Sequence, residues 1–429
     1  MKIIGIDIGT TGICGVCAES ESGEIIKSVS LPNESFIKSD LEYERIQDTA
    51  VIMQTVYSIL ESLDAAEAAA IGFSGQMHGI VYTDANGNAV SPLYTWQDAR
   101  ANAEYKDGKS FAQALGCFAG YGLATDFYND KIGLIPQDAV YLCTIADYAV
   151  MQLCGNKKPV CHITNAASLG CFDLVANRFN LDNPRLPDVT ADFVCCGKYN
   201  GVPVSVALGD NQASFIGSVS DERDALLNVG TGAQISWLSP SPVSAEAVET
   251  RPFDGKRYLA AGCSLCGGRA YAMFEKFCRE IANAAGAEID TFYPFLNKML
   301  ENKNESEVTG DCRFCGTRNN PELRGGYLGI SENSFTPADF AFATLDGMAQ
   351  ELFDMYASAD TKAAGLVCSG NGMRKNAHLR KIVAEKFSCE IKIPLYEEEA
   401  ACGAAFSALV AGGYCDDIGT ACSKIRYKD

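Results

Sequence analysis

The order of apolar and polar positions near the N-terminus predicts a strand pair, then a helix, then a further strand. Residues 2–20 (KIIGIDIGTTGICGVCAES) have clustered or alternating apolar side chains on both sides of a Gly-Thr-Thr-Gly turn, as in two strands joined by a reversal. Residues 48–63 carry apolar side chains at helical spacing, and Asp48 is placed to cap that helix. The run 69–75 (AAIGFSG) then predicts a strand that enters the loop QMHG.

A similar order returns in the second half of the chain. Residues 224–238 (DALLNVGTGAQISWL) again predict a strand, a Gly-Thr-Gly turn and a strand. Residues 364–370 (AGLVCSG) predict a strand that enters a turn at Asn-Gly-Met, and residues 374–387 predict an amphipathic helix. A strand at 390–394 and a helix at 397–413, which glycines close, complete the pattern.

This recurrence predicts two related domains. The chain has 429 residues, which is too long for one ordinary core. A strand–glycine turn–strand unit occurs in each half, and repeats of that length indicate related domains rather than a solenoid. The polar stretch 218–224 suggests the boundary, so we expect domains at 1–217 and 218–429. Each half mixes strands and helices, which predicts an α/β fold class with a ligand-binding cleft between the domains.

Composition and charge narrow the classes of partner. Hydrophobic residues make up 47% and charged residues 21% of the chain, and the formal net charge is −19. Because nucleic acids and anionic membranes require basic surfaces, we expect no nucleic-acid and no membrane partner. An anionic ligand remains compatible with this charge, since backbone N–H groups can hold a phosphate. The start of the chain does not have the pattern of a signal peptide.

The cysteine pattern favours a reducing compartment. An odd number, 19, is scattered over a long chain, which predicts a cytoplasmic protein rather than a secreted disulfide framework. Two pairs, Cys263/Cys266 and Cys312/Cys315, have CxxC spacing. A zinc site built from all four is one interpretation. Small buried residues of a reduced protein are the other, and it is favoured because so many cysteines make such spacing easy to meet.

The two glycine turns carry candidate phosphate-binding chemistry. In the first turn, glycines allow a phosphate to approach the backbone, Thr10 and Thr11 add donors, and Asp7 offers a carboxylate for hydrated Mg²⁺. A tight hairpin that merely needs glycine is the structural alternative. The second turn, within residues 228–234, has the same donor-rich character, and together the two turns could hold the phosphates of one nucleotide. The chain contains no GxxxxGK[ST] segment, so this is not a P-loop.

Asp210 stands directly after the apolar run 202–209 (VPVSVALG) and before Asn-Gln-Ala-Ser. This position predicts a carboxylate at the end of a strand and the start of a helix, where α/β proteins bind ligands. An ordinary helix N-cap is the structural alternative. The residue types alone leave both interpretations open.

With these motifs in order, the sequence resembles the FGGY family of carbohydrate kinases across essentially its whole length. Within the family, QMHG with TWQD is most similar to the corresponding segments of sedoheptulokinases, and next to those of xylulokinases. The segments that carry the resemblance are GIDIGTTG, GFSGQMHG, LYTWQDAR, TNAASLGCFDL, ALGDNQAS, LNVGTGAQIS, FCGTRNNPELRGGYLGI, SGNGMRKNAHL and EEEAACGAAF.

The resemblance implies two actin-like (ribonuclease H-like) ATPase domains that face a central cleft and close over ATP, Mg²⁺ and a sugar. The γ-phosphoryl group would pass to a terminal sugar hydroxyl, with Asp210 as the general base and Asp7 at the metal. The implied sugar-contact residues are Gln76, Met77, His78, Trp96, Asp98 and Asn211. The implied nucleotide-binding residues are Thr10, Thr11, Gly12, Gly230, Thr231, Gly232, Gly370, Asn371 and Gly372.

One of these sugar-site residues, Trp96, has a structural alternative. Trp96 either stacks on an apolar face of the sugar or packs as a half-buried aromatic. Asp98 would accept hydrogen bonds from sugar hydroxyls, with Arg100 holding it in place.

At the nucleotide end, Gly370-Asn371-Gly372 departs from the family's Gly-Gly turn. Asn tolerates positive φ, so we expect the turn to persist with altered adenosine contacts.

Three functions remain to be distinguished. The leading hypothesis is an ATP-dependent ketose kinase acting on D-sedoheptulose, or next on D-xylulose or D-ribulose. A non-catalytic ATP-binding switch on the same actin-like scaffold and a sugar-binding regulator with a decayed ATP site are the alternatives. Asp210 together with QMHG and TWQD favours the kinase, because a switch needs no sugar pocket. The identity of the sugar and the oligomeric state, a homodimer included, stay open.

Overall fold

The structure is a computed structural model that describes residues 1–245, 247–359 and 361–428. By their internal contacts the residues form two compact units, which we call the first and the second unit. The first unit consists of residues 1–221, 251–258 and 398–426, and the second of residues 222–250, 259–397 and 427–429. The predicted domain division at 217/218 stays a prediction. The contact units differ from it in placing residues 398–426 with the N-terminal part of the chain.

The first unit is built on a mixed sheet in the strand order β16-β17-β6-β1-β2-β3, with β18 paired to β6. The predicted strand pair around the first glycine turn is confirmed as β1 and β2, which run antiparallel with Asp7 opposite Cys14. β6 and β18 run parallel in the centre of the sheet, beside β1. The strands are β1 (Lys2–Ile8), β2 (Gly12–Glu19), β3 (Ile25–Pro32), β6 (Ala70–Gly75), β16 (Cys195–Tyr199), β17 (Val202–Ser205) and β18 (Leu208–Gly209).

The first predicted helix is also confirmed. Helix α1 (Thr49–Ser62) begins after Asp48, whose side chain accepts hydrogen bonds from the backbone N–H groups of Ala50 and Val51. Its apolar stripe packs into the core under the sheet, where Ile52, Val56 and Ile59 have no exposed surface. The other helices of this unit are α2 (Phe111–Leu115), α3 (Gly122–Ile132), α4 (Ile145–Cys154), α5 (Ile163–Ser168), α6 (Asp210–Ser218), α12 (Glu399–Ala411) and α13 (Ile418–Cys422).

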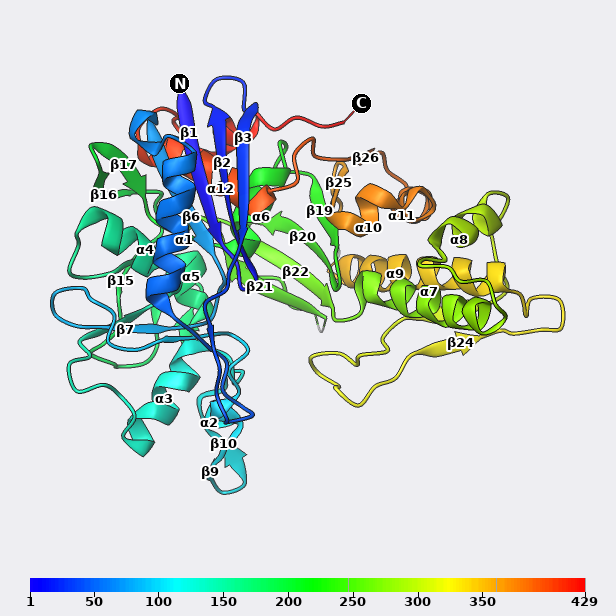
Figure 1. Cartoon of the computed structure of the whole chain (residues 1–429), viewed down its shortest axis with the longest axis horizontal. Coiled ribbons are helices and arrows are strands. Elements are labelled where there is room, and N and C mark those ends of the chain that lie inside the picture. The colour runs from blue at the N-terminus through cyan, green and yellow to red at the C-terminus, as the bar shows by residue number, and fades with distance from the viewer. Residues whose placement is uncertain (246, 360, 429) are drawn as a thin grey trace. The chain divides into compact units, whose positions relative to one another are not determined.

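Helix α12 explains why the C-terminal segment belongs to the first unit (Figure 1). Its small residues allow its backbone to lie directly on β1, β6 and α6. A Cβ on Gly5 of β1 would stand 1.8 Å from the carbonyl oxygen of Ala401, and one on Gly217 of α6 would stand 1.9 Å from that of Glu399. Side chains at these positions would push α12 away, so glycine is required for this close packing.

Shorter elements complete the first unit. They include two-stranded pairs such as β7 with β11 and β13 with β14. Their bounds are β4 (Phe36–Ile37), β5 (Ile46–Gln47), β7 (Val81–Thr83), β8 (Leu93–Tyr94), β9 (Glu104–Lys106), β10 (Lys109–Ser110), β11 (Tyr141–Cys143), β12 (Val160–His162), β13 (Phe172–Asp173), β14 (Arg178–Phe179) and β15 (Asp188–Thr190).

The second unit contains a sheet in the order β21-β22-β20-β19-β25-β26. The predicted strand pair around the second glycine turn is confirmed as β19 (Ala225–Val229) and β20 (Ala233–Ser239), and β25 (Leu366–Ser369) runs parallel to β19. The remaining elements are β21 (Val248–Pro252), β22 (Tyr258–Ser264), β23 (Thr309–Asp311), β24 (Gly326–Leu328), β26 (Ile391–Lys392), α7 (Gly267–Ala284), α8 (Tyr293–Leu300) and α9 (Pro337–Ala357).

The segment after β25 differs from its prediction. Instead of a turn followed by one helix, the chain forms α10 (Gly370–Lys375) directly after the strand and then α11 (Ala377–Phe387). Asn376 separates the two helices because its side chain accepts the backbone N–H of Leu379 and caps α11. The positive φ expected of Asn371 falls instead on Gly370, at 80°. A Cβ at Gly370 would also stand 2.6 Å from the Val229 carbonyl oxygen, so this position favours glycine twice over.

Candidate functional site

Three neighbouring strands of the first unit end together and bring Asp7, Ser74 and Asp210 to one edge of the sheet. Asp7 lies opposite Ser74 in the parallel pairing of β1 with β6. Leu208 of β18 lies opposite the same Ser74, and Asp210 follows two residues later. The Ser74 hydroxyl donates to Asp7 Oδ1 at 2.7 Å. The edge where parallel strands end is the usual ligand-binding position of α/β proteins.

Asp210 is the first residue of α6, and it does not cap the helix. Gly209 occupies the N-cap position, with no side-chain capping hydrogen bond. The carboxylate instead accepts a hydrogen bond from the amide of Asn211, with Nδ2 2.8 Å from Oδ1. The same amide lies 3.6 Å from the sulfur of Met77. Asp210 and Asn211 are thereby joined to the predicted sugar-binding turn.

The electrostatics of this edge raise the proton affinity of Asp7. Burial and, after it, the charge of Asp210 raise the pKa of Asp7 to about 7, and the Ser74 hydrogen bond opposes part of this shift. Burial also raises the pKa of Asp210, while the Asn211 amide and the positive charge of Arg251 lower it. Asp7 and Asp210 are therefore two buried carboxylates whose negative charge is only partly balanced by nearby positive charge.

This donor set fits a magnesium ion. Mg²⁺ is bound by one or two carboxylates together with water and phosphate oxygens, and a divalent cation would remove the repulsion that raises the pKa of Asp7. Among the residues that the structure describes, no group of three or more His, Cys, Asp or Glu side chains could hold a metal by itself. That statement covers the two CxxC pairs, so a four-cysteine zinc centre is not formed there.

The predicted sugar turn is tied to the first glycine turn. Gln76 and Met77 each expose only 4% of their surface. The Thr10 hydroxyl donates to Gln76 Oε1 at 3.3 Å and accepts the indole N–H of Trp96 at 2.9 Å. Gln47 adds a third link, because its amide donates to the Thr10 carbonyl oxygen at 2.9 Å and accepts from Gln76 at 2.9 Å. Thr10, assigned to the nucleotide by resemblance, is thus in contact with two predicted sugar-site residues.

His78 occupies a constrained backbone position. Its φ is 74°, a left-handed conformation that non-glycine residues rarely adopt. Its ring Nδ1 lies 2.7 Å from the carbonyl oxygen of Ser168, and the Ser168 hydroxyl accepts the His78 backbone N–H at 3.1 Å. The ring stacks on Tyr121 with centroids 4.4 Å apart and an interplanar angle of 11°. These contacts hold the imidazole in place from two sides.

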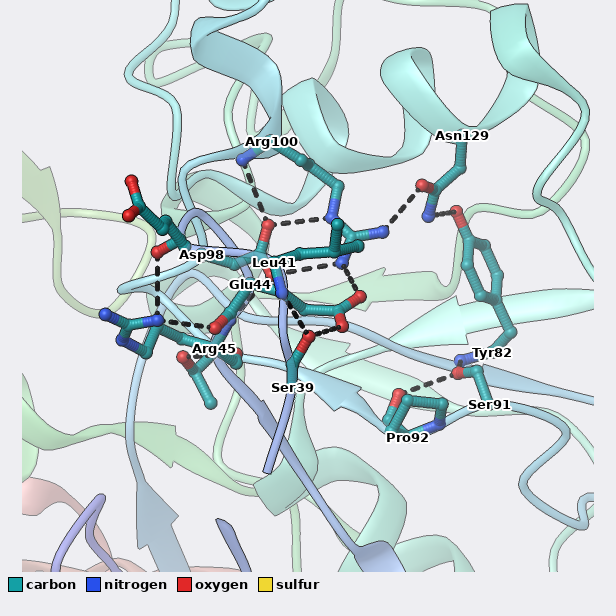
Figure 2. A network of polar contacts seen from close by, with 12 residues as sticks. Ser39, Leu41, Glu44, Arg45, Tyr82, Ser91, Pro92, Asp98, Arg100 and Asn129 are labelled. Carbon is teal, nitrogen blue, oxygen red and sulfur yellow. Dashed lines mark hydrogen bonds and ion pairs between the residues drawn. The ribbon is translucent and has the colours of Figure 1, made fainter. Parts of the chain in front are cut away.

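Asp98 is buried, with 1% of its surface exposed, and its carboxylate is engaged by protein groups (Figure 2). Its Oδ1 accepts from Arg100 Nε at 2.7 Å, and its Oδ2 accepts from Arg100 Nη2 at 3.0 Å and from the Arg45 backbone N–H at 3.0 Å. The predicted support by Arg100 is therefore present as a bidentate ion pair. In this conformation Asp98 holds the loop after β8, and its direct contact with sugar stays a prediction.

The same arginine extends the network away from the loop (Figure 2). Arg100 donates to Glu44 Oε1 and to Asn129 Oδ1, both at 3.0 Å, and its guanidinium lies 4.2 Å from the centre of the Tyr94 ring. Asn129 in turn donates to the Tyr82 hydroxyl at 3.4 Å. The loop that carries Trp96 and Asp98 is therefore fastened to α3 and to β7 by fully paired buried groups.

In the second unit, the Gly230–Gly232 turn lies on the start of α7. The carbonyl oxygen of Gly230 accepts the Gly268 N–H at 2.9 Å, and that of Thr231 accepts the Arg269 N–H at 3.1 Å. Asn228 reaches across to β25, where its amide donates to the Ser369 hydroxyl at 2.7 Å. This bond holds the turn beside the start of α10.

A cavity of about 570 Å³ opens beside these turns within the second unit. It brings together four of the predicted nucleotide-binding residues: Gly230, Thr231, Asn371 and Gly372. Gly232 and Gly370 do not line it, although they belong to the same turns. The other lining residues are Gly268, Arg269, Tyr271, Ala272, Tyr293, Asn297, Leu345, Met348, Lys375, Asn376 and Leu379. The size and mixed lining are those of a small-molecule site.

Sequence reasoning missed several residues that the fold brings to these sites. Ser74 and Gln47 act through hydrogen bonds to Asp7 and Gln76, and neither stands in a recognisable chemical motif. The charge of Arg251 lowers the pKa of Asp210 from a distant part of the sequence. Tyr271 lies in α7, three strands after the second glycine turn. Only the Ser74 position had a signal, since it lies near the end of the predicted strand 69–75 and within the segment GFSGQMHG.

The comparisons with known proteins agree with this architecture. The N-terminal domain of the FGGY family of carbohydrate kinases matches residues 2–118, and the C-terminal domain of that family matches residues 225–412. These matches cover more than half of the chain, so the chain belongs to the FGGY family of carbohydrate kinases. It is a carbohydrate kinase of the two-domain actin-like (ribonuclease H-like) fold, as predicted.

Individual relatives refine this assignment. The chain is 28% identical to the sedoheptulokinase of Mus musculus, over 90% of this chain and 92% of that protein. It is 23% identical to the xylulose kinase of Staphylococcus xylosus, over 95% of this chain and 90% of that protein. The ligand-bound xylulose kinase structure from Lactobacillus acidophilus superposes with a TM-score of 0.85 at 20% identity, covering 100% of this chain and 93% of that one. The predicted order of resemblance, sedoheptulokinases and then xylulokinases, is confirmed.

Among the described residues, no helix combines the length and apolar character needed to cross a bilayer.

Proposed function

We propose that this carbohydrate kinase transfers the γ-phosphoryl group of ATP to a terminal hydroxyl of a ketose, with D-sedoheptulose as the preferred substrate. The observation that carries the proposal is the contact between Asp210, Asn211 and Met77. It joins a carboxylate of raised pKa to the turn that the family uses for sugar. The match to a sedoheptulokinase over nearly the whole chain supports the choice of sugar. D-xylulose is the second candidate, since xylulose kinases follow among the relatives.

In this proposal Asp210 is the general base. Its carboxylate accepts the proton of the terminal hydroxyl as that oxygen forms a bond to the γ-phosphorus and the bond to the β–γ bridging oxygen breaks. The Asn211 amide holds one carboxylate oxygen at 2.8 Å, and the other oxygen would accept the proton of the hydroxyl. A raised pKa helps, because a carboxylate with higher proton affinity accepts the proton more readily.

The sugar would be held by the turn at 76–78 and by Trp96. Gln76 and His78 offer polar atoms for hydroxyl groups, and both are held by neighbouring side chains before any ligand arrives. Trp96 exposes 46% of its surface, so its ring face is available to an apolar face of the sugar, although its N–H is engaged by Thr10. Such preorganisation lowers the cost of orienting the reacting hydroxyl.

The nucleotide would use the cavity of the second unit and the glycine turns. Backbone N–H groups of the turns can donate to phosphate oxygens, and Arg269 and Lys375 supply positive charge at the cavity. Asp7 would hold magnesium, which when bound neutralises charge on the β- and γ-phosphates. Protonated Asp7 would release its proton on binding the cation.

The deciding experiment is a coupled ADP-release assay over a panel of neutral and acidic sugars. D-sedoheptulose should give the highest kcat/KM, followed by D-xylulose and D-ribulose, with glycerol and gluconate far lower. Phosphorus NMR of the product should place the phosphate on the terminal carbon. If no compound of the panel raises ADP release above background, the ketose-kinase proposal fails. A preference for xylulose would overturn only the choice of sugar.

A further inference from the structure

Two cysteines of the first unit face each other close to His78. Cys117 follows α2, Cys171 precedes β13, and their sulfur atoms are 3.6 Å apart. Both thiols are half-buried and neither is in a disulfide. A disulfide needs about 2.05 Å between the sulfurs, so modest side-chain rotations and a closing of about 1.5 Å would join them. The sequence gives no hint of this pair, because 54 residues separate the two cysteines.

We propose that Cys117 and Cys171 form a peroxide-sensitive dithiol whose oxidation to a reversible disulfide alters the sugar site. The proposal goes beyond the kinase reaction, and its first test is independent of any activity.

The chemistry of the pair suits this role. The hydrogen bond from the Cys171 thiol lowers the pKa of Cys117 to about 7, so a substantial fraction of Cys117 is thiolate at neutral pH. Both sulfur atoms also lie near the carbonyl oxygen of Leu115, at 3.7 and 3.8 Å, so the two side chains lie beside the same backbone group. Cys117 is thus the attacking sulfur and Cys171 the resolving one.

The oxidation balances with one peroxide. The Cys117 thiolate attacks a peroxide oxygen, the O–O bond breaks, and the departing hydroxide takes a proton and leaves as water. The resulting sulfenic acid is attacked by the Cys171 sulfur. The S–S bond forms, the S–O bond breaks, and the Cys171 proton completes a second water. The two thiols lose two electrons and hydrogen peroxide gains them.

The position of the pair couples it to His78. Cys171 lies three residues after Ser168, whose carbonyl oxygen contacts the His78 ring at 2.7 Å. Cys117 lies four residues before Tyr121, whose ring stacks on the other side of His78. Gly170, between Ser168 and Cys171, lies against the segment 117–121, since a Cβ there would stand 2.8 Å from Cys117 Sγ and 3.2 Å from Tyr121 Cδ2. Drawing the sulfurs together therefore moves the two segments that hold the imidazole.

The first arm of the test maps the bond. Purified full-length protein is treated with hydrogen peroxide, remaining thiols are alkylated, and tryptic peptides are analysed by mass spectrometry. We expect a linked pair of peptides containing Cys117 and Cys171, with fragment ions that exclude Cys161 of the second peptide. The link should disappear after dithiothreitol and in C117S and C171S. Cys195→Ser, which removes an exposed cysteine of the same unit, is the matched control and should keep the link.

The second arm measures the coupling. With the three histidines labelled, the NMR signals of the His78 ring should shift on oxidation and return on reduction, whereas those of His378 should not. If the sugar kinase assay succeeds, oxidation should raise the KM for sugar by about threefold or more and leave the KM for ATP nearly unchanged. Failure of the kinase assay would count against the proposed function alone.

Distinct results would overturn the proposal. Absence of the Cys117–Cys171 link in peroxide-treated wild type excludes the dithiol. A link without any change in the His78 signals excludes the coupling to the sugar site. Equal peroxide sensitivity in C171S and wild type assigns the effect to other cysteines.

Discussion

The indole N–H of Trp96 donates to the Thr10 hydroxyl at 2.9 Å, which joins the loop after β8 to the glycine turn after β1. Thr10 also donates to Gln76, so a single hydroxyl connects the predicted phosphate turn with two predicted sugar-site residues, Trp96 and Gln76. Because of this hydrogen bond, a ligand that reorients the Trp96 ring would also change the position of Thr10 in the glycine turn.

Trp96 should therefore report sugar binding. The protein has two tryptophans, and Trp237 exposes only 3% of its surface against 46% for Trp96. Addition of D-sedoheptulose should change the intrinsic fluorescence, and W96F should remove the change while raising the KM for sugar by about three- to tenfold. W237F is the control that keeps the response. A sugar-dependent signal that survives in W96F would remove Trp96 from the site.

Asp210→Asn should remove the proposed general base and slow phosphoryl transfer, without disturbing nucleotide binding. General-base catalysis contributes about 100- to 10,000-fold, so kcat should fall within that range. Binding of an ATP analogue, measured by calorimetry, should stay within about twofold because the cavity proposed for the nucleotide lies in the second unit. Asp192→Asn, an exposed carboxylate of the first unit, is the matched control with unchanged kcat. Full activity in D210N would exclude Asp210 as the base.

Stability of the ligand-free protein should depend on Asp7. The pKa of its carboxyl is about 7 in the folded protein and has the ordinary value of 3.8 in the unfolded chain, so between these pH values the folded state binds more protons. The free energy of unfolding must then fall as pH rises from about 4 to about 7. Urea unfolding across this range should show that decline, and D7N should reduce it.

A residual decline in D7N is expected from Asp147, whose pKa burial raises to about 6. Saturating Mg²⁺ with ATP should also weaken the pH dependence, because the cation favours the ionised carboxylate. An identical pH slope in D7N and wild type would contradict the raised pKa of Asp7.

Removal of the Arg100 side chain should destabilise the protein strongly. The Arg100–Asp98 pair is buried, with 2% and 0% of the two side chains exposed, so R100A leaves an unpaired buried carboxylate. We expect a loss of about 3–5 kcal/mol in urea unfolding, partly restored in the double variant with D98N. Lys131→Ala breaks an ion pair whose side chains are 44% and 43% exposed, and should cost under about 1 kcal/mol. Similar losses in R100A and K131A would show that the buried network is not structural.

The Tyr271 hydroxyl should bind the nucleotide. Tyr271 lines the cavity of the second unit with 6% of its surface exposed, and its hydroxyl has no hydrogen-bond partner among the described residues. An unsatisfied buried hydroxyl costs stability until a ligand pairs with it. Tyr271→Phe should raise the KM for ATP by about three- to tenfold and leave stability unchanged or slightly higher.

Tyr293→Phe is the matched control for this prediction, because Tyr293 lines the same cavity but is 38% exposed. Its hydroxyl has access to water, so its removal should change the KM for ATP little. An unchanged KM in Y271F together with a loss of stability would mean that the hydroxyl serves the fold instead.

Much of the secondary structure follows from local pattern. The Gly-Thr turns, the Asp48-capped helix and the strand that ends at Ser74 were predictable because each depends on neighbours within a few residues. The break between α10 and α11 was not, because the helical periodicity runs through it and the capping role of Asn376 is visible only in its hydrogen bond. The local pattern also did not show that Gly370, and not Asn371, has the positive φ.

The sequence by itself determined the kind of chemistry: two glycine turns, a carboxylate after a strand and the family to which they belong. Only the tertiary structure decided that Asp210 is joined to Met77 through Asn211 and that Asp98 is occupied by Arg100. It also decided that Cys117 faces Cys171. The physical reason is the separation of the interacting residues along the sequence. Turns and caps are set by bonds between neighbouring residues, whereas these contacts join segments that only the packing of the core brings within hydrogen-bond distance.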